Sequence, residues 1–230
     1  MASPAPYRFS VLFDLDGTLH NDDVAVPLLV DAAAAHGYRF DGESVLKGER
    51  FVPRLQMELG IDSERAETVY ATYVRMYQER AIHVARPLEY AAELIRSLHS
   101  QGVGLALVTH KLEAVARAVL RAFDVHEQFG GVFGADSLPH RKPDARVALA
   151  ALERIGGQPQ SAAIVGDTPA DMVCGRDAGL RLVIGVLGTV TPSELRDSGA
   201  THVVSGLREV EGVLQQHVLA SPFPPPGAPR

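Results

Sequence analysis

The sequence predicts an α/β protein in which helices cover both faces of a parallel sheet and an all-helical segment follows the first strand. Three observations lead to this prediction. Short apolar runs rich in β-branched residues recur along the chain, and helical patterns separate most of them. Residues 20–86 contain helix-like stretches and no convincing strand. The chain has 230 residues, 46% of them hydrophobic, which is enough to bury a sizeable core.

The expected strands are the apolar runs themselves, because a run that is apolar throughout is typical of a strand buried on both faces. In chain order these runs are 9–13, 103–108, 132–133, 162–165, 182–186 and 202–204. The segment before the second run has a helical pattern, with apolar residues on one face and Glu89, Glu93 and Arg96 on the other. Such alternation of strand and helix favours a parallel sheet.

The helical insertion is expected to span residues 20–86. Its three helix-like stretches are 24–36, 43–59 and 63–81, and glycine-containing turn signals separate them. Arg86-Pro87 marks the return to the sheet, because the residue before a proline favours extended geometry.

Two domains and a tail are therefore expected. The α/β core domain comprises residues 1–19 and 87–220, and the helical domain comprises residues 20–86. Residues 221–230 are rich in proline and are expected to form a disordered tail.

Charge and composition argue against several classes of protein. A formal net charge of −6 disfavours a nucleic-acid-binding surface, which depends on clustered Lys and Arg. No apolar run is long enough to span a bilayer, and the N-terminus lacks a signal-peptide pattern. The single cysteine, Cys174, cannot form an intramolecular disulfide. We expect a cytoplasmic protein that acts without nucleic acid or membrane, and its oligomeric state is left open.

Two pairs of acidic residues follow apolar runs. Asp14 and Asp16 come directly after the first run, and Asp167 and Asp171 follow the fourth. In open parallel sheets, ligands bind beyond the carboxyl ends of the strands. Asp14-Leu15-Asp16 alone is about equally well explained by an acid that caps a turn. Two such clusters together form an oxygen-rich site suited to Mg²⁺, and a cation would offset the cost of burying them.

Hydrogen-bonding and basic residues between these pairs suit a phosphate group. Thr109 and His110 end the second run, where a hydroxyl and the amides of an expected helix start can bind phosphate oxygens. Taken singly, Thr109 is explained as a helix N-cap. Lys142 lies in the loop Arg141-Lys142-Pro143, which alone reads as a solvated basic loop. The order acid pair, Thr, Lys, acid pair favours a phosphate site.

In these motifs the chain resembles the haloacid dehalogenase superfamily of phosphatases. Its four motifs match D-x-D-G-T at residues 14–18, Thr109, Lys142, and G-D-x-x-x-D at residues 166–171. The resemblance implies a Rossmann-like parallel core with an inserted cap domain. The helical insertion resembles the cap of the group that contains phosphoglycolate phosphatase and β-phosphoglucomutase. Residues 108–111 and 134–144 look most like the phosphoglycolate phosphatases.

The resemblance also implies a mechanism. Asp14 would attack phosphorus to form an aspartyl phosphate, which divides the hydrolysis into two displacements. Asp16 would protonate the leaving alkoxide and then activate water, so its pKa is expected nearer neutrality than that of a free carboxyl. Mg²⁺ would bind the Asp14 carboxylate, the Asp16 backbone carbonyl and the Asp167 carboxylate, with Asp171 as a ligand or an orienting residue.

The implied activity is that of a Mg²⁺-dependent phosphatase for a small phosphorylated metabolite, similar to phosphoglycolate. Thr109, His110 and Lys142 would bind the phosphate. The candidates for contacts with the rest of the substrate are Lys47, Arg50 and Arg54 in the cap, although a charge run of this kind is usually the solvated face of a helix.

Three alternatives remain open at this point. A phosphomutase of the same fold would return the phosphoryl group to a sugar. A non-enzymatic receiver module would also be phosphorylated on Asp, but it leaves the helical insertion and the second acid cluster unexplained. A glycosyltransferase that uses D-x-D to hold a metal leaves Thr109 and Lys142 without roles.

Overall fold

The structure is a computed structural model that describes residues 7–39, 41–42, 51–188 and 190–219. The expected tail, 221–230, lies outside the described residues. The chain divides into two compact units, one formed by residues 1–21 and 87–230 and the other by residues 22–86. Within the described ranges, no helix has the length and apolarity needed to cross a membrane.

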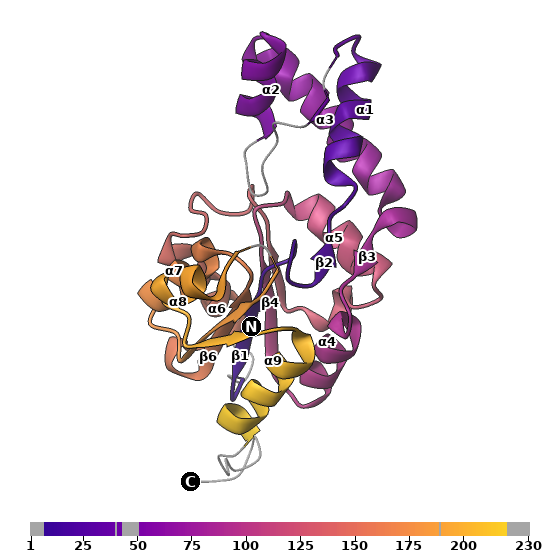
Figure 1. Cartoon of the computed structure of the whole chain (residues 1–230). Helices are drawn as coiled ribbons and strands as arrows, with labels where there is room; N and C mark the ends of the chain where they lie inside the picture. Colours follow the sequence, from indigo (N-terminus) through magenta and orange to yellow (C-terminus); the bar gives the residue numbers. More distant parts are fainter. Residues whose placement is uncertain (1–6, 40, 43–50, 189, 220–230) are drawn as a thin grey trace. The chain divides into compact units, whose positions relative to one another are not determined.

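The first unit contains a six-stranded sheet in the order β5-β4-β1-β6-β7-β8, and all neighbouring strands are parallel (Figure 1). Its strands are β1 (Ser10–Phe13), β4 (Gly104–Val108), β5 (Gly131–Phe133), β6 (Ala162–Gly166), β7 (Leu182–Val186) and β8 (His202–Val204). Each apolar run of the sequence thus forms a strand, and the predicted α/β fold class is confirmed.

Helices cover both faces of this sheet. They are α4 (Ala91–Ser100), α5 (Glu113–Ala122), α6 (Ala145–Ile155), α7 (Pro169–Asp177), α8 (Pro192–Asp197) and α9 (Leu207–Leu214). Successive side chains of a strand point to opposite faces. Accordingly, Leu12 of β1 belongs to the core formed with α6 and α7, whereas Val11 lines a small apolar cavity beside Leu98 of α4 and Leu214 of α9. Strand β1 is therefore buried on both sides.

Short one-turn segments complete this unit. They are 3₁₀ turns at His126–Gln128 and Pro159–Ser161 and a π-helical turn at Gln215–Leu219.

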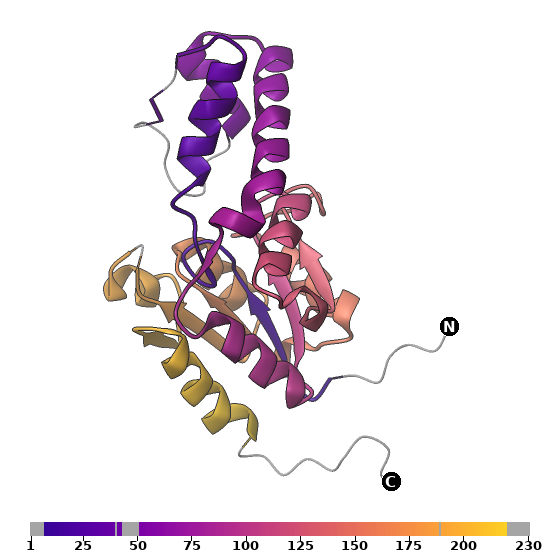
Figure 2. The ribbon, with the colours of Figure 1, turned by 90° about the vertical axis from the view of Figure 1, so that its right-hand side faces the viewer.

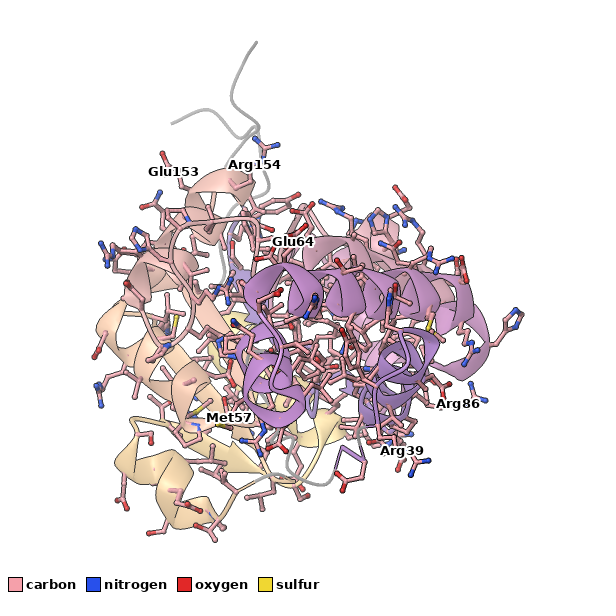
Figure 3. All side chains as sticks on the ribbon, turned by 90° about the horizontal axis from the view of Figure 1, so that it is seen from above. Arg39, Met57, Glu64, Arg86, Glu153 and Arg154 are labelled. Carbon is pink, nitrogen blue, oxygen red and sulfur yellow. The ribbon has the colours of Figure 1, made fainter. Side chains whose placement is uncertain are left out.

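The second unit is helical. It consists of α1 (Ala25–Ala35), α2 (Phe51–Leu59) and α3 (Ser63–Val84), and α3 packs against both of the others (Figure 2). Of the expected stretch 43–59, residues 43–50 lie outside the described residues. Leu55 of α2 is buried, whereas Met57 on the same helix is 65% exposed (Figure 3).

An aromatic cluster on α3 forms part of the core of the helical unit. The rings of Tyr70 and Tyr73 stack with centroids 5.6 Å apart, and Tyr73 meets Tyr77 edge to face at 5.8 Å. The Tyr77 hydroxyl donates a hydrogen bond to Asp22 Oδ1 at 2.9 Å. A buried tyrosine thus satisfies its polar end while its ring fills the core.

Two strands of two residues each were not predicted. They are β2 (His20–Asn21) and β3 (Arg86–Pro87), and they pair in a small sheet of their own. Two residues are too few to produce an alternating pattern, and the sequence indicates only extended geometry at Arg86, before Pro87.

Candidate active site

Three polar side chains lie at the carboxyl ends of adjacent strands in the α/β unit. Asp14 follows β1, Thr109 follows β4 and Asp167 follows β6. Phe13 is opposite both Leu107 and Val165 in the sheet register, so the three strands end at nearly the same level. All three polar residues are buried. The parallel sheet thus brings together residues that are far apart in the sequence.

A tight turn follows Asp14. The amides of Leu19 and His20 both donate to the carbonyl of Leu15 at 2.9 Å, and the Gly17 amide donates to the His20 carbonyl at 2.8 Å. Gly17 has a φ of 86°, and a Cβ there would overlap the Asp167 carboxylate. Glycine is therefore required by both the backbone conformation and the contact.

Lys142 connects two of the acids. Its Nζ donates to Asp14 Oδ1 and to Asp171 Oδ1, each at 2.6 Å. The second oxygen of Asp171 accepts hydrogen bonds from the Thr168 amide at 3.2 Å and the Thr168 hydroxyl at 2.6 Å. Asp171 thus contacts Lys142 through one oxygen and the start of α7 through the other.

Burial and charge shift the pKa values of this cluster. Burial, reinforced by Asp171 and Asp167, raises the pKa of Asp14 to about 8, although Lys142 acts in the opposite direction. Burial alone would lower the pKa of Lys142, but Asp14 and Asp171 outweigh it and raise that pKa above its ordinary value. The lysine is therefore charged, and Asp14 needs further positive charge to be ionised at neutral pH.

The acidic cluster has the donor set of a divalent-metal site. Asp14, Asp167 and Asp171 are all buried, and each offers a carboxylate oxygen within 4.8 Å of the others. Oxygen ligands of this kind suit Mg²⁺. Lys142 supplies one positive charge against three carboxylates, so a bound cation would also relieve their mutual repulsion. The cluster therefore fits the expected metal.

Asp16 lies beside a different pair of partners. Lys111 Nζ is 3.2 Å from Asp16 Oδ1 and 3.1 Å from Oδ2, and His20 Nδ1 is 2.9 Å from Oδ1. Burial would raise the pKa of Asp16, but Lys111 and His20 outweigh it and hold this pKa well below its usual range. The expectation of a pKa nearer neutrality is therefore not met in this arrangement, because two donors stabilise the carboxylate.

Thr109 and His110 differ in part from their expected places. Helix α5 begins at Glu113 after Leu112, so Thr109 precedes the helix and does not cap it. The Thr109 hydroxyl accepts a hydrogen bond from the Lys111 amide at 3.2 Å. His110 Nε2 donates to the carbonyl of Lys142 at 3.0 Å, and burial together with Lys142 lowers the His110 pKa. His110 thus holds the loop that carries Lys142.

The cap candidates are only partly within the described structure. Lys47 and Arg50 lie outside the described residues. Arg54 lies on α2 and forms an ion pair with Glu58, with 3.0 Å between Nη2 and Oε1. A substrate-binding role for these three residues stays a prediction.

Sequence reasoning assigned no role to His20 or Lys111 at this site. The available signals were modest: His20 is four residues after Asp16, and Lys111 follows Thr109-His110. Neither spacing indicates a contact until the path of the turn after β1 is known.

Comparison with known proteins identifies the family. A sequence profile of the haloacid dehalogenase-like hydrolases matches residues 11–185, which is most of the chain and includes all four motifs. The chain belongs to this haloacid dehalogenase-like hydrolase family. The recognition made from the sequence motifs is confirmed.

The relatives of this hydrolase include phosphoglycolate phosphatases. That of Aquifex aeolicus is 29% identical over 182 residues, covering 78% of this chain and 85% of that protein. That of Caulobacter vibrioides is 28% identical over 229 residues, covering 95% of each. The crystal structure of a hydrolase from Pseudomonas syringae has a TM-score of 0.71 and 25% identity, covering 90% of this chain and 98% of that one. The expected enzyme class, a phosphoric monoester hydrolase, is supported at the level of the family.

Proposed function

We propose that this hydrolase is a Mg²⁺-dependent phosphatase that cleaves a small-molecule phosphate monoester through an aspartyl phosphate on Asp14. The observation that carries the proposal is the buried cluster in which Lys142 joins Asp14 to Asp171 beside Asp167. Such a cluster supports the proposal because it would bring a nucleophile, a cation and oxygen ligands for a metal into one site.

Asp14 is the proposed nucleophile. Its carboxylate oxygen forms a bond to phosphorus while the bond from phosphorus to the ester oxygen breaks, and the phosphoryl group is then carried on Asp14. Lys142 is within hydrogen-bond distance of Asp14, so it reduces the repulsion between this carboxylate and a phosphate dianion. A bound Mg²⁺, held by the carboxylates of Asp14 and Asp167 and the carbonyl of Asp16, would supply further charge neutralisation.

Asp16 is the proposed acid and base. It gives a proton to the departing ester oxygen in the first displacement and accepts one from water in the second, when the bond between phosphorus and Asp14 breaks. The depressed pKa of Asp16 keeps its carboxylate ionised, as the second role requires. For the first role the carboxyl must be protonated, so substrate binding has to weaken the hold of Lys111 on it.

Thr109 and His110 complete the site in this proposal. The buried Thr109 hydroxyl is available to donate to a phosphoryl oxygen while it accepts from the Lys111 amide. His110 supports the phosphate contact indirectly, through the Lys142 carbonyl.

The substrate is proposed to be a small phosphorylated metabolite similar to phosphoglycolate. Support comes from the names of several relatives, including those of Aquifex aeolicus and Caulobacter vibrioides, which are phosphoglycolate phosphatases. We propose that the helical unit, residues 22–86, is the cap domain that determines which ester is accepted. A cytoplasmic location, expected from the single cysteine, stays a prediction.

The test is a screen of small phosphate monoesters with Mg²⁺, with release of inorganic phosphate as the measurement. We expect turnover by the natural protein and none by Asp14→Asn, because the amide is not a nucleophile for phosphorus. Circular dichroism checks that the variant is folded. Retained turnover in Asp14→Asn would rule out this nucleophile, and transfer of the phosphoryl group to a sugar in place of release would show a phosphomutase.

A further inference from the structure

His20 lies against the proposed acid and base in a fully buried position. Its Nδ1 is 2.9 Å from Asp16 Oδ1, and its side chain has no solvent exposure, while that of Asp16 is 33% exposed. No established role in the site requires a histidine here, so the contact calls for an explanation.

The position of the His20 ring is fixed by its own turn. The His20 amide donates to the Leu15 carbonyl, and the His20 carbonyl accepts from Gly17. Its ring also packs against Phe123, with centroids 5.7 Å apart. The backbone and the packing together hold the imidazole in one orientation, so it is a rigid partner for the more exposed carboxylate.

The hydrogen-bond pattern indicates which nitrogen carries the proton. Asp16 Oδ1 accepts, so Nδ1 of His20 is the donor. Nε2 is buried without a hydrogen-bond partner within the described part of the chain. The ring nitrogen that faces Asp16 is therefore the one that donates in this contact.

His20 and Lys111 hold Asp16 from different segments of the chain. Lys111 follows β4 and contacts both carboxylate oxygens, whereas His20 closes the turn after β1 and contacts one. A single point charge leaves a carboxylate free to rotate, but a second, directional donor on Oδ1 fixes its plane. The directional contact is the one that His20 supplies.

We propose that His20 is a positioning residue for Asp16, and that its Nδ1–H fixes the orientation in which the carboxyl transfers protons. The inference rests on the proposed function, because it assumes that Asp16 is the acid and base. Misplacement of a catalytic group by about 1 Å costs on the order of 100-fold in rate. The loss is expected in proton transfer and not in substrate binding.

The test compares His20→Asn with His20→Gln. The amide nitrogen of Asn lies near the place of Nδ1 and keeps the donor, whereas the longer Gln moves its amide towards the place of Nε2. Both variants keep a buried polar group, so their thermal unfolding midpoints should be similar. His202→Asn is the control, since His202 on β8 lies at the far edge of the sheet from β4.

Two substrates separate the steps. An alkyl phosphate needs a proton on its leaving oxygen, whereas p-nitrophenyl phosphate releases a stable phenolate without one. For His20→Gln we expect kcat/KM for the alkyl ester to fall about 100-fold, within the range for general acid catalysis, with KM nearly unchanged. With the aryl ester we expect a burst of p-nitrophenol followed by slow turnover, because phosphorylation of Asp14 continues but activation of water is impaired. His20→Asn should retain most of both activities.

Equal losses for the two esters without a burst, or an unchanged alkyl phosphatase activity in His20→Gln, would overturn the positioning role. Failure of the proposed function looks different, because the natural protein would then release phosphate from no ester.

Discussion

At the residue scale, a proton and the proposed metal ion would compete for the carboxylate of Asp14. Burial beside Asp171 and Asp167 raises its pKa to about 8, so below that pH the protonated form is favoured in the metal-free protein. A carboxylate must lose its proton to bind a metal, so the binding of Mg²⁺ releases that proton and is favoured by higher pH.

We therefore predict that Mg²⁺ stabilises the protein more strongly as pH rises from about 6 to about 9, the window around this raised pKa. The measurement is the shift in thermal midpoint on addition of Mg²⁺ at each pH. Asp14→Asn should show a small shift with little dependence on pH, because the titrating oxygen is gone. A metal-induced shift that is constant with pH in the natural protein would contradict this assignment.

At the element scale, two helices of the α/β unit begin with the same cap. Thr168 caps α7 and its amide and hydroxyl donate to Asp171, while Thr191 caps α8 and makes the same two bonds to Glu194. The first cap also orients the carboxylate that accepts from Lys142, whereas Glu194 is exposed and hydrogen-bonds with Thr191 at the start of α8.

The two caps allow a matched comparison. Thr168→Ala and Thr191→Ala should each destabilise the protein by about 1 kcal/mol, the usual cost of losing an N-cap. Only Thr168→Ala should also lower kcat/KM, by about 10- to 100-fold, as expected for a residue that orients a group in the site. Chemical denaturation measures the loss of stability in both variants, and steady-state kinetics measure their kcat/KM. Equal kcat/KM in Thr168→Ala and Thr191→Ala would show that the hydrogen bonds from Thr168 are not needed to orient Asp171.

Some structural elements could be predicted from the sequence alone, and others could not. The six strands of the large sheet could be predicted because each contains an apolar run, and Asp14, Thr109 and Asp167 because each directly follows one of these strands. The start of α5 could not, since Lys111 accepts a hydrogen bond from the Ala135 amide and the chain turns there before the helix begins. The contact of His20 with Asp16 depends on the path of a single turn, which no periodicity describes.

At the scale of the whole molecule, the two units have separate cores. Leu55 is buried in the helical unit, and Leu12 is buried in the sheet of the other unit. Truncation of a buried leucine to alanine usually costs about 2–5 kcal/mol. Because local unfolding follows compact cooperative units, we expect this loss to remain within the unit that contains the substitution.

We predict that Leu55→Ala accelerates hydrogen exchange in α2 and α3 while the amides of β1, β4 and β6 keep their protection. Met57→Ala is the matched control, since Met57 lies two residues further along the same helix and is 65% exposed (Figure 3). Hydrogen exchange in Met57→Ala should match that of the natural protein in both units. Faster exchange in the sheet of Leu55→Ala would show that the two units unfold together.

The central position of strand β1 in the sheet has a consequence for folding during synthesis on the ribosome. It is synthesised before β4 and β6, the two strands between which it lies, and their segments begin only at Gly104 and Ala162. At about 5–20 residues per second, β1 waits several seconds for its neighbours. The helical unit, whose partners are close in sequence, is complete long before then. Asp14, the proposed nucleophile, is thus synthesised well before Asp167, and a nascent chain can assemble the proposed centre only after β6 has been made.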